Sequence, residues 1–525
     1  MTDRARSSDL AGLAELLRGR GMLRAVVGSA DGIPVGDIQF DSRDVRTGDV
    51  FVAVPGAERD GHEFCATAVE RGAAALIVER PLPDIGVPQL VVNSSRSALA
   101  LAAAWRLGFP SRDLGVIGIT GTDGKTTTSY LVRGMLLACG YPAGLITTIE
   151  AICGGVSKGY SGHTTPEAPV VQADLRAMVD AGDRYAIVES TSHGLALERV
   201  AEVAYDIAVL TNITHEHLDL HGTYEAYVAA KRSLFERLAV SESNPEKGFG
   251  KHAVINARDA EGPSFAAAAG AAGAQVLTYS VGHDVGADIV ATAVVDTALG
   301  LAFFVRTARW EADVELNLAG SFNAHNALAA IGVGEALGLD PVAMRRGLAG
   351  VRHVTGRMQP VVAGQPFDVY VDFAHTPGAL AATIAALAPV AAARGGGVIA
   401  LFGSPGSRDI AKRPMMGAAA AEHSRVVIVT ADDPRAEDPA QIAEEIAAGA
   451  LAAGRTRGVD LIIEPDRRAA IRRAFELAMP NDIVLLAGKG HEATIAMKDG
   501  PLPWDEPAIA AETLAALGYS PRREG

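Results

Sequence analysis

The chain has 525 residues, of which 49% are hydrophobic and 21% charged, so it can form about three compact domains and is too apolar to be disordered. Its net charge of −15 argues against nucleic acid as a main partner, because a phosphate backbone would be repelled, although a locally basic pocket can still hold a small anion. Three cysteines without metal-ligand spacing predict a reducing compartment and no disulfide framework.

The first segment, residues 1–112, alternates short predicted strands (50–54 and 74–78) with helices, one of them at 99–105. Its opening residues are charged and patterned like a short helix, so we expect no signal peptide. No apolar run reaches the ~18 residues of a membrane helix, and we expect a cytoplasmic protein. Before the first of these strands, Ser42 and Arg43 could hold a diphosphate or a uracil, or Arg43 could simply pair with Asp41 in a turn.

The second segment, residues 113–350, opens with a phosphate-binding pattern. A buried strand is predicted at 114–119, then a turn with Gly121 and Gly124, then a helix from Thr126. Glycines let backbone N–H groups approach phosphate oxygens, and the helix N-terminus adds partial positive charge. Lys125 can reach the outer phosphates, and the Thr126 hydroxyl can bind Mg²⁺. The loop is shorter than a general P-loop, but it predicts a nucleoside triphosphate site.

Two later strands of this segment also end in polar residues. One, at 185–189, ends in Glu189, and the other, at 207–213, is followed by a histidine-rich turn with His217. Because ligands bind beyond the carboxyl ends of parallel strands, we expect these ends to serve one nucleotide–Mg²⁺ site. Zinc held by the histidines is the weaker alternative, because nucleotide chemistry uses oxygen ligands. By residue pattern alone, Lys231 on a helix at 224–235 is expected at the surface.

The third segment, residues 351–525, predicts a second doubly wound parallel sheet. Its strands at 368–373, 398–402, 425–430 and 483–486 each lead into a polar or glycine-rich turn. Arg408, Asp433, Arg435 and Glu492 follow these strands and would gather at one edge. Two guanidiniums and two carboxylates suit a zwitterionic amino acid, whereas solvated loop charges are the simpler alternative.

Assembled in order, these motifs resemble the Mur ligase family, and within it the MurE subfamily. The resemblance covers nearly the whole chain and rests on these segments: Asp41-Ser-Arg43, Thr120-Gly-Thr-Asp-Gly-Lys-Thr-Thr127, Thr164-Thr-Pro166, Ser192-His-Gly194, His217-Leu-Asp219, Gly356-Arg-Met358, Asp372-Phe-Ala-His-Thr-Pro377, Asp432-Asp-Pro-Arg435 and Gly488-Lys-Gly-His-Glu492.

The resemblance implies an α/β fold of three domains: an N-terminal UDP-binding domain (1–112), a central P-loop ATPase with a parallel sheet (113–350) and a C-terminal Rossmann-like domain (351–525). It implies five sets of site residues. ATP would be bound by Gly121, Thr122, Asp123, Gly124, Lys125, Thr126, Thr127, Asn323, Arg357 and Asp372. The UDP-linked substrate would contact Ser42, Thr164, Thr165, Thr191 and Arg199. Mg²⁺ would involve Thr126, Glu189, His217 and a CO₂-derived carbamate on Lys231, and catalysis Lys125, Glu189, His217 and Lys231. The amino acid would meet Arg408, Asp432, Asp433, Pro434, Arg435, Gly488 and Glu492.

The implied reaction is ATP-dependent addition of a diamino acid to UDP-N-acetylmuramoyl-L-Ala-D-Glu, through an acyl phosphate, in peptidoglycan precursor synthesis. The resemblance implies a cytoplasmic monomer without membrane insertion. The chain departs from the family pattern at Asp123, where relatives commonly have Asn, and at 403–409, which lacks a Cys-Gly-Gly-Asp segment. It also has Asp433 where enzymes selecting meso-diaminopimelate typically have Asn.

The amino acid added is the open point. Arg435 with Arg408 favours meso-diaminopimelate through its distal carboxylate, whereas Asp433 favours the distal ammonium of L-lysine or L-ornithine. We predict meso-diaminopimelate. The alternatives are a sibling ligase, such as MurF or a folylpolyglutamate synthase, and a nucleotide switch or amidotransferase subunit without ligase turnover. Asp41-Ser-Arg43 together with Gly488–Glu492 favours the MurE subfamily over the siblings.

Overall fold

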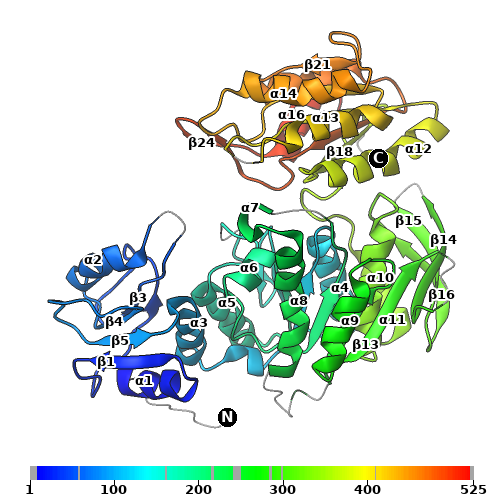
Figure 1. Ribbon diagram of the computed structural model, residues 1–525. Helices are drawn as coiled ribbons and strands as arrows, with labels where there is room; N and C mark the ends of the chain where they lie inside the picture. Colours follow the sequence, from blue (N-terminus) through cyan, green and yellow to red (C-terminus); the bar gives the residue numbers. More distant parts are fainter. Residues whose placement is uncertain are drawn as a thin grey trace. The chain divides into compact units, whose positions relative to one another are not determined.

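The computed structural model describes residues 9–56, 59–159, 162–214, 218–240, 247, 250–282, 286–296, 300–407 and 409–520. The chain divides into two compact units. The first contains residues 1–278 with 332–339, and the second contains residues 279–331 with 340–525. Figure 1 shows the course of the chain through both, and each is described by itself.

The first unit begins with a five-stranded sheet in the order β1-β5-β4-β3-β2. Its strands are β1 (Leu23–Val27), β2 (Ile38–Gln39), β3 (Val50–Val52), β4 (Ala75–Val78) and β5 (Gln89–Val92). Helices α1 (Leu10–Gly19) and α3 (Ser95–Arg106) pack on one face and α2 (Cys65–Glu70) on the other, with the 3₁₀ turns η1 (Gly61–Phe64) and η2 (Pro110–Arg112) between elements. Both predicted strands are confirmed. The predicted helix starts earlier than expected, because Ser94 caps it by accepting from Ser97 N.

A second sheet of the first unit carries the phosphate loop. Its parallel strands lie in the order β12-β11-β6-β10-β7, and β8 and β9 continue it as an antiparallel extension. The strands are β6 (Gly115–Thr120), β7 (Ala143–Ile146), β8 (Ala151–Cys153), β9 (Val156–Ser157), β10 (Tyr185–Glu189), β11 (Ile207–Leu210) and β12 (His252–Asn256). The helices are α4 (Lys125–Ala138), α5 (Ala168–Asp180), α6 (Ser192–Ala196), α7 (Leu218–His221), α8 (Tyr224–Val240) and α9 (Gly262–Ala271).

In this sheet β6 lies between β10 and β11, with Ile119 opposite Glu189 and Thr120 opposite Leu210. The carboxyl ends of three strands, distant in sequence, are therefore adjacent, as predicted. Six consecutive buried residues make β6 an apolar run typical of a parallel strand covered on both faces. Gly118 is required there, because a Cβ at that position would lie 2.6 Å from the ring of Tyr205.

The second unit starts with an antiparallel meander, β14 (Ile289–Asp296), β15 (Leu301–Arg306) and β16 (Glu311–Leu316), which the chain enters through β13 (Gln275–Val281). Helices α10 (Asn323–Ala336) and α11 (Pro341–Gly350) follow.

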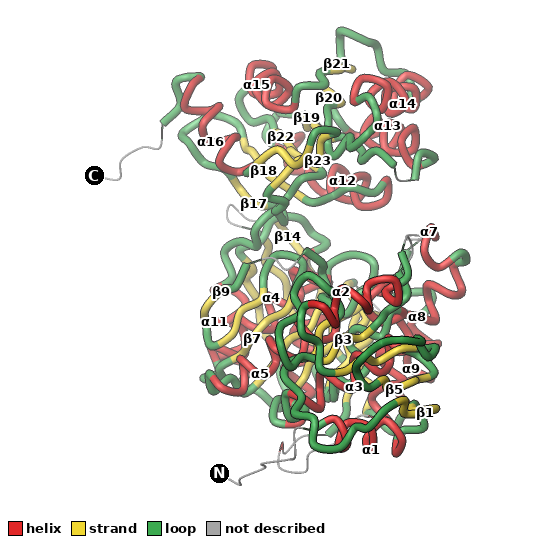
Figure 2. Tube along the Cα trace, turned by 90° about the vertical axis from the view of Figure 1, so that its left-hand side faces the viewer, coloured by secondary structure: helices red, strands yellow, loops and turns green. Residues whose placement is uncertain are grey.

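The rest of the second unit is a six-stranded sheet in the order β17-β18-β22-β19-β20-β21. Its strands are β17 (Gln359–Pro360), β18 (Asp368–Asp372), β19 (Val398–Phe402), β20 (Val426–Val429), β21 (Leu461–Ile463) and β22 (Ile483–Ala487), and a hairpin, β23 (Thr494–Met497) and β24 (Gly500–Pro503), lies beyond it. Helices α12 (Pro377–Ala393), α13 (Lys412–His423) and α14 (Pro439–Ala452) cover one face, and α15 (Arg467–Leu477) and α16 (Glu506–Ala516) cover the other (Figure 2).

This arrangement confirms the predicted doubly wound sheet and its four strands. Sequence reasoning missed β21, whose three residues are too short a run to stand out. Among the helices that the structure describes, none is long and apolar enough to cross a bilayer.

Candidate active site

The phosphate loop between β6 and α4 depends on two glycines. Gly121 has φ +144° and Gly124 has φ +82°, conformations that other residues rarely adopt. A Cβ on Gly121 would lie 1.9 Å from Thr211 Oγ1, so this position has no room for a side chain. Helix α4 starts directly after Gly124, which aims its N-terminus at the loop.

The end of β11 braces this loop from the neighbouring strand. Thr211 Oγ1 donates to the carbonyl of Asp123 at 2.6 Å, and Asp123 N donates to Asn212 Oδ1 at 3.0 Å. The hydroxyls of Thr122 and Tyr227 on α8 are hydrogen-bonded at 2.8 Å. Only backbone atoms of Asp123 take part in these contacts and its side chain is exposed, so replacing the family's Asn by Asp keeps the bracing.

Two lysine ammonium groups converge on the loop carbonyls. Lys125 Nζ donates to Gly121 O at 3.1 Å and to Thr122 O at 2.7 Å. Lys231 Nζ donates to Gly121 O at 2.6 Å and lies 4.7 Å from the ring centroid of Tyr227. Lys231 is only 2% exposed, so the expectation that it lies at the surface is wrong. Two cations at one loop suit a polyanionic ligand.

Glu189, at the end of β10, is the buried carboxylate of this site. It is 1% exposed and accepts hydrogen bonds from Thr126 Oγ1 at 3.1 and 3.0 Å. Thr148 donates to it through both N and Oγ1, each at 3.1 Å. A hydroxyl and a carboxylate at a phosphate loop are the oxygen donors that Mg²⁺ prefers, so Thr126 and Glu189 fit this ion. His217, the further predicted ligand, lies outside the described residues.

Sequence reasoning missed Thr148. The available signal was Thr147-Thr148 directly after β7, the strand next to β10. Thr148 Oγ1 and Thr164 Oγ1 are also hydrogen-bonded at 3.1 Å, which joins the phosphate loop to a residue predicted to bind the UDP-linked substrate.

Thr165, Thr191 and Arg199 extend this hydrogen-bond network. Thr165 Oγ1 donates to Glu189 O at 2.8 Å and is hydrogen-bonded to Thr191 Oγ1 at 2.9 Å. Arg199 donates to Thr165 O at 3.0 Å and pairs with Glu167 at 2.7 Å. Four of the five predicted UDP-substrate residues are therefore connected to Glu189.

Ser42, the fifth, lies in a turn of the N-terminal sheet. Beside it, Arg43 donates to Asp41 at 2.9 Å and its side chain is 86% exposed. The hydrogen bond from the Arg43 side chain lowers the pKa of Asp41 below its ordinary value. The structure thus contains the simple Asp–Arg turn, and no described contact joins Ser42 to the threonine network.

The predicted nucleotide residues of the second unit make internal contacts. Asn323, the first residue of α10, donates to Ala319 O at 2.6 Å and accepts from Asn326 at 2.9 Å. Asp372, at the end of β18, accepts from Met358 N and Ala374 N, both at 2.8 Å. The Arg357 guanidinium lies over the ring of Phe373, 4.6 Å from its centroid.

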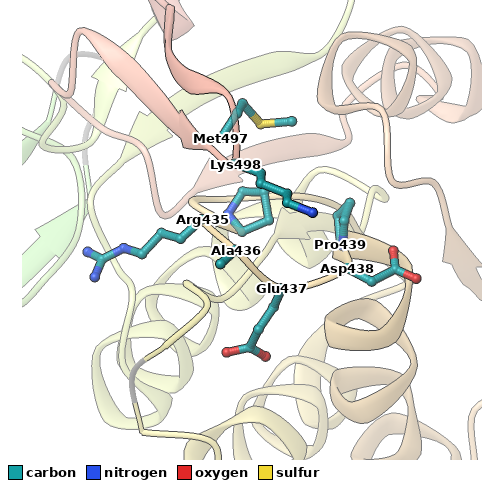
Figure 3. A pocket seen from close by; sticks show the side chains of 8 residues that line it. Arg435, Ala436, Glu437, Asp438, Pro439, Met497 and Lys498 are labelled. Carbon is teal, nitrogen blue, oxygen red and sulfur yellow. The ribbon is translucent and has the colours of Figure 1, made fainter.

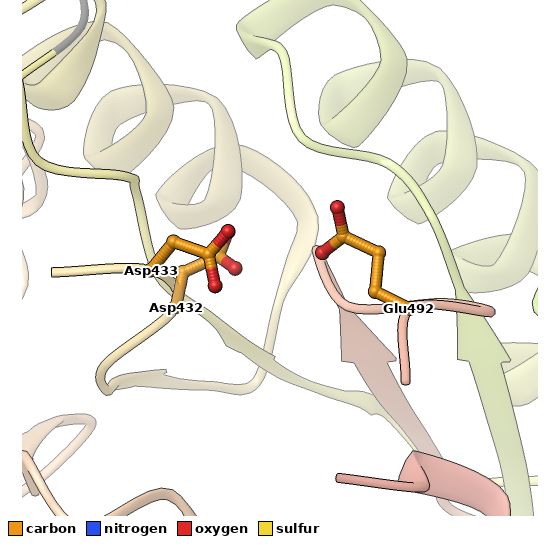
Figure 4. Close-up of side chains that lie close together, drawn as sticks. All are labelled: Asp432, Asp433 and Glu492. Atoms are coloured by element: carbon orange, nitrogen blue, oxygen red, sulfur yellow. The ribbon is translucent and has the colours of Figure 1, made fainter. Parts of the chain in front are cut away.

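The predicted amino-acid residues gather around a lysine that sequence reasoning did not include. Figure 4 shows the carboxylates of Asp432, Asp433 and Glu492 pointing toward one another. Lys489 is fully buried, with Nζ 2.8 Å from Asp433, 2.6 Å from Glu492 and 3.6 Å from Asp432. The three acids are close enough to hold a metal ion, but the Lys489 ammonium lies among them. We call these four residues the acid–lysine cluster.

Burial and the neighbouring charges shift the pKa values of two groups in the acid–lysine cluster, Lys489 and Glu492. Burial acts to lower the pKa of Lys489, but the three carboxylates, Asp432 foremost, raise it above its ordinary value. Burial raises the pKa of Glu492, and the Lys489 ammonium opposes this rise. Asp433 Oδ1 also accepts from Ala496 N at 2.9 Å, so two internal donors share this oxygen.

Arg435 follows on the same loop, in a left-handed conformation with φ +55° and with its N donating to Ala496 O at 2.8 Å. A pocket of about 300 Å³ opens beside it, lined by residues 434–439 with Met497 and Lys498 (Figure 3). Gly488 meets the other side of this loop, because a Cβ there would lie 3.1 Å from Asp432 Oδ2. Arg408 lies outside the described residues.

Comparisons with known proteins show to which family the chain is similar. Three family models match the chain: the Mur ligase family catalytic domain over residues 35–106, the Mur ligase middle domain over 119–334, and the Mur ligase glutamate ligase domain over 356–490. A UDP-N-acetylmuramyl-tripeptide synthetase of Roseiflexus sp. (strain RS-1) is 46% identical over 92% of this chain and 95% of its own length.

A UDP-N-acetylmuramoyl-L-alanyl-D-glutamate–2,6-diaminopimelate ligase of Solibacter usitatus is 41% identical over 92% of this chain and 94% of its own length. A solved structure of a UDP-N-acetylmuramoyl-L-alanyl-D-glutamate–2,6-diaminopimelate ligase covers 98% of this chain at 28% identity, with a TM-score of 0.66. That match takes in 100% of the solved chain. With family models in all three segments and relatives that match nearly its whole length, the chain belongs to the Mur ligase family.

Proposed function

We propose that this protein is the ATP-dependent ligase that joins a diamino acid, meso-diaminopimelate by preference, to UDP-N-acetylmuramoyl-L-Ala-D-Glu. One observation carries the proposal. Glu189 connects Thr126 of the phosphate loop, through Thr148, to Thr164, and through its own carbonyl to Thr165. One hydrogen-bond network therefore joins a triphosphate site to the residues predicted to bind the UDP-linked substrate. The names of the Roseiflexus and Solibacter relatives support the same activity.

The chemistry explains why the two sites must adjoin. A carboxylate is a poor acyl donor, so the terminal phosphoryl group of ATP is transferred to the γ-carboxylate of D-glutamate, which gives an acyl phosphate and ADP. The amine of the diamino acid attacks the acyl carbon, and phosphate leaves from the tetrahedral intermediate. Lys125 and the loop N–H groups stabilise the charge on the transferring group. Mg²⁺, when held by Thr126 and Glu189 with His217, would neutralise phosphate charge.

We further propose that CO₂ converts the Lys231 amine to a carbamate, with loss of a proton. Lys231 is buried next to the phosphate loop, where an ammonium would repel a metal ion. A carbamate supplies two anionic oxygens instead. Replacement of Lys231 by Ala should then abolish phosphate release, and added chloride or short carboxylic acids should restore part of it. Full activity of Lys231→Ala without such additions would contradict the carbamate.

The acid–lysine cluster supports the choice of amino acid. Lys489 compensates Asp433 from within the protein, which weakens Asp433 as the receptor of a substrate ammonium. Within the described part of the chain, the Arg435 guanidinium has no hydrogen bond or ion pair, so it is available to a distal carboxylate. The cluster still has a formal charge of −2, from three carboxylates and one ammonium, which suits the ammonium that meso-diaminopimelate also has at its far end.

Three further features belong to this proposal. The family models fall within the segments 1–112, 113–350 and 351–525, which supports these domain boundaries. Cys65, Cys139 and Cys153 are free thiols, which supports a reducing, cytoplasmic location. A monomer stays a prediction, which sedimentation of the purified protein would test.

The test is phosphate release from ATP, Mg²⁺ and UDP-N-acetylmuramoyl-L-Ala-D-Glu, with the amine varied among meso-diaminopimelate, L-lysine and L-ornithine. Release that depends on meso-diaminopimelate is expected. Stimulation by lysine or ornithine alone would change the amino acid but keep the reaction. Phosphate release that does not depend on any of the three amines would contradict ligase activity and favour a nucleotide switch. A Lys125→Ala variant, inactive with every amine, controls for contaminating ATPases.

A further inference from the structure

A fully buried ion pair lies behind the acid–lysine cluster. Arg467, the first residue of α15, and Glu506, the first residue of α16, are 1% and 0% exposed in their side chains. Arg467 Nη2 donates to Glu506 Oε1 at 2.6 Å, and Arg467 Nε lies 3.1 and 3.0 Å from the two oxygens. Trp504 Nε1 donates to Glu506 Oε2 at 2.5 Å, so both carboxylate oxygens are held.

The same guanidinium also binds two main-chain carbonyls. Arg467 Nη1 donates to Ala431 O at 2.9 Å and Nη2 to Ala487 O at 2.8 Å. Ala431 directly precedes Asp432, and Ala487 directly precedes Gly488 and Lys489. Ala431 therefore lies in one of the two loops that supply the cluster, and Ala487, the last residue of β22, leads directly into the other.

The sheet itself does not connect these two loops. The strands that lead into them, β20 and β22, are separated by β19, so they lie about 10 Å apart and share no ladder hydrogen bonds. At the carboxyl ends of β20 and β22, the Arg467 side chain links the backbones of the two segments directly. The loops meet closely there, since a Cβ on Gly488 would be 3.1 Å from Asp432 Oδ2.

We propose that Arg467, held by Glu506 and Trp504, is a positioning residue for the amino-acid site. It sets the distance between the Asp432-Asp433 loop and the Gly488–Glu492 loop, and so the geometry offered to the diamino acid. A planar guanidinium can serve two carbonyls and a carboxylate at once, whereas a lysine is a single point charge. This role rests on the proposed function, because the amino-acid site is part of it.

The chain contains a matched control pair at the opposite end of the same two strands. Arg425, directly before β20, donates to Asp482, directly before β22, at 2.5 Å and to Leu477 O at 3.1 Å. Asp482 is fully buried. Breaking this pair disturbs β20 and β22 at their amino ends, away from the site. Its effect on the kinetic constants therefore shows what a loss of stability alone does.

The experiment compares Arg467→Lys, Arg467→Met and Arg425→Met with the wild type, by Tm, kcat and the separate KM values for diamino acid and ATP. We expect Arg467→Lys to raise the KM for the diamino acid about tenfold or more, because a displacement of about 1 Å in a binding loop has effects of this size. The KM for ATP should change less than about twofold. Arg425→Met should lower Tm and leave both KM values unchanged.

A wild-type KM in Arg467→Lys would overturn the proposal, as would an equal rise of KM in Arg425→Met. If Arg467→Met does not fold, the Trp504→Phe variant replaces it. This variant removes one hydrogen-bond donor to Glu506, which should loosen Arg467 and raise the KM for the diamino acid about two- to threefold. A wild type without amine-dependent phosphate release would instead contradict the proposed function, and the positioning role would fall with it.

Discussion

The phosphate-loop site of the first unit and the acid–lysine cluster of the second are built on different physical terms. In the first, backbone shape dominates: two glycines in left-handed conformations, braced by neutral hydroxyls and amides, surround a single buried carboxylate, Glu189. In the second, charge dominates: three carboxylates surround one buried ammonium, and a second buried ion pair holds their loops.

The difference predicts how each site fails. A backbone-built site tolerates the loss of a single hydroxyl but not the addition of a Cβ, because there is no space for it. In a charge-built site the loss of the single cation leaves its carboxylates uncompensated, whereas the loss of one of three carboxylates leaves the cation still paired.

The largest effect is expected for Gly121→Ala. Its Cβ would lie 1.9 Å from Thr211 Oγ1, on a residue with φ +144°, so the loop must move away from the end of β11. ATP binding should be lost and kcat should fall by about a thousandfold or more, since misplaced phosphate donors forfeit most of the electrostatic stabilisation. Isothermal titration with ATP and phosphate release measure this.

The control is Gly270→Ala, on α9, where an added Cβ meets nothing within 4 Å. It should keep full activity, and its free energy of unfolding should rise by about 0.5–1 kcal/mol from helix propensity. Gly121→Ala with normal ATP affinity would show that the braced loop geometry is not what binds the nucleotide.

Lys489→Met is expected to cost about 3 kcal/mol of unfolding free energy, because it leaves the buried Asp432 and the partly buried Asp433 and Glu492 without their cation. The loss should depend on pH. The pKa of Glu492 is raised in the folded protein. Ionisation of this carboxyl therefore destabilises the fold increasingly as the pH rises from the ordinary pKa of a glutamate to the raised one. Without the opposing ammonium that slope should steepen, and the variant should recover stability as the pH falls toward the ordinary pKa of a glutamate.

Urea denaturation at several pH values measures this, with the exposed Lys498→Met as a control that should stay within about 0.5 kcal/mol of the wild type. A loss in Lys489→Met that does not change with pH would mean that the carboxylates are not what the ammonium compensates.

The same contrast explains what could be predicted from the sequence. Strands β6 and β19 and the order of strands and helices follow from apolar runs between glycine-rich turns, since both signals are local. The phosphate loop is local as well: Gly121 to Thr127 is one continuous stretch, and its function depends on backbone shape that the residue types dictate.

The charged partners could not be predicted this way. Lys489 lies inside a recognised motif, yet its partner Asp433 is 56 residues away, and Arg467 meets Glu506 across 39 residues. Lys231 was expected at the surface because helix periodicity does not reveal that Gly121 of the phosphate loop accepts a hydrogen bond from its side chain. Which charge pairs with which is decided by strand order, and β22 inserts between β18 and β19 without a local signal.

Thr148→Val tests the hydroxyl network with a smaller change. It removes the one hydroxyl that is hydrogen-bonded to Glu189 and Thr164, while it conserves shape and the backbone N–H bond to Glu189. We expect kcat to fall about tenfold and stability by about 1 kcal/mol, the usual cost of a lost hydrogen bond. Thr120→Val is the matched control, because the buried Thr120 Oγ1 has no hydrogen-bond partner among the described residues, and its removal should be neutral. Equal effects of the two variants would show that the network does not orient Glu189.

The smallest effect is expected for Asp433→Asn, although this residue looks decisive in the sequence. Asn retains an oxygen for Lys489 and Ala496 N, so the cluster should keep its geometry while its formal charge changes from −2 to −1. Activity with meso-diaminopimelate should stay within about threefold of the wild type. Any activity with L-lysine should fall several-fold, because the variant has one carboxylate fewer to attract the distal ammonium of lysine.

Ratios of kcat/KM for the two amines measure that selectivity, and Asp438→Asn, on the exposed rim of the neighbouring pocket, serves as the control. If Asp433→Asn instead lost activity by a hundredfold with both amines, Asp433 would bind the substrate directly in spite of its internal partners. The charge compensation by Lys489 would then describe only the protein without its substrate, and the ammonium of the diamino acid would have to displace that of Lys489 on binding.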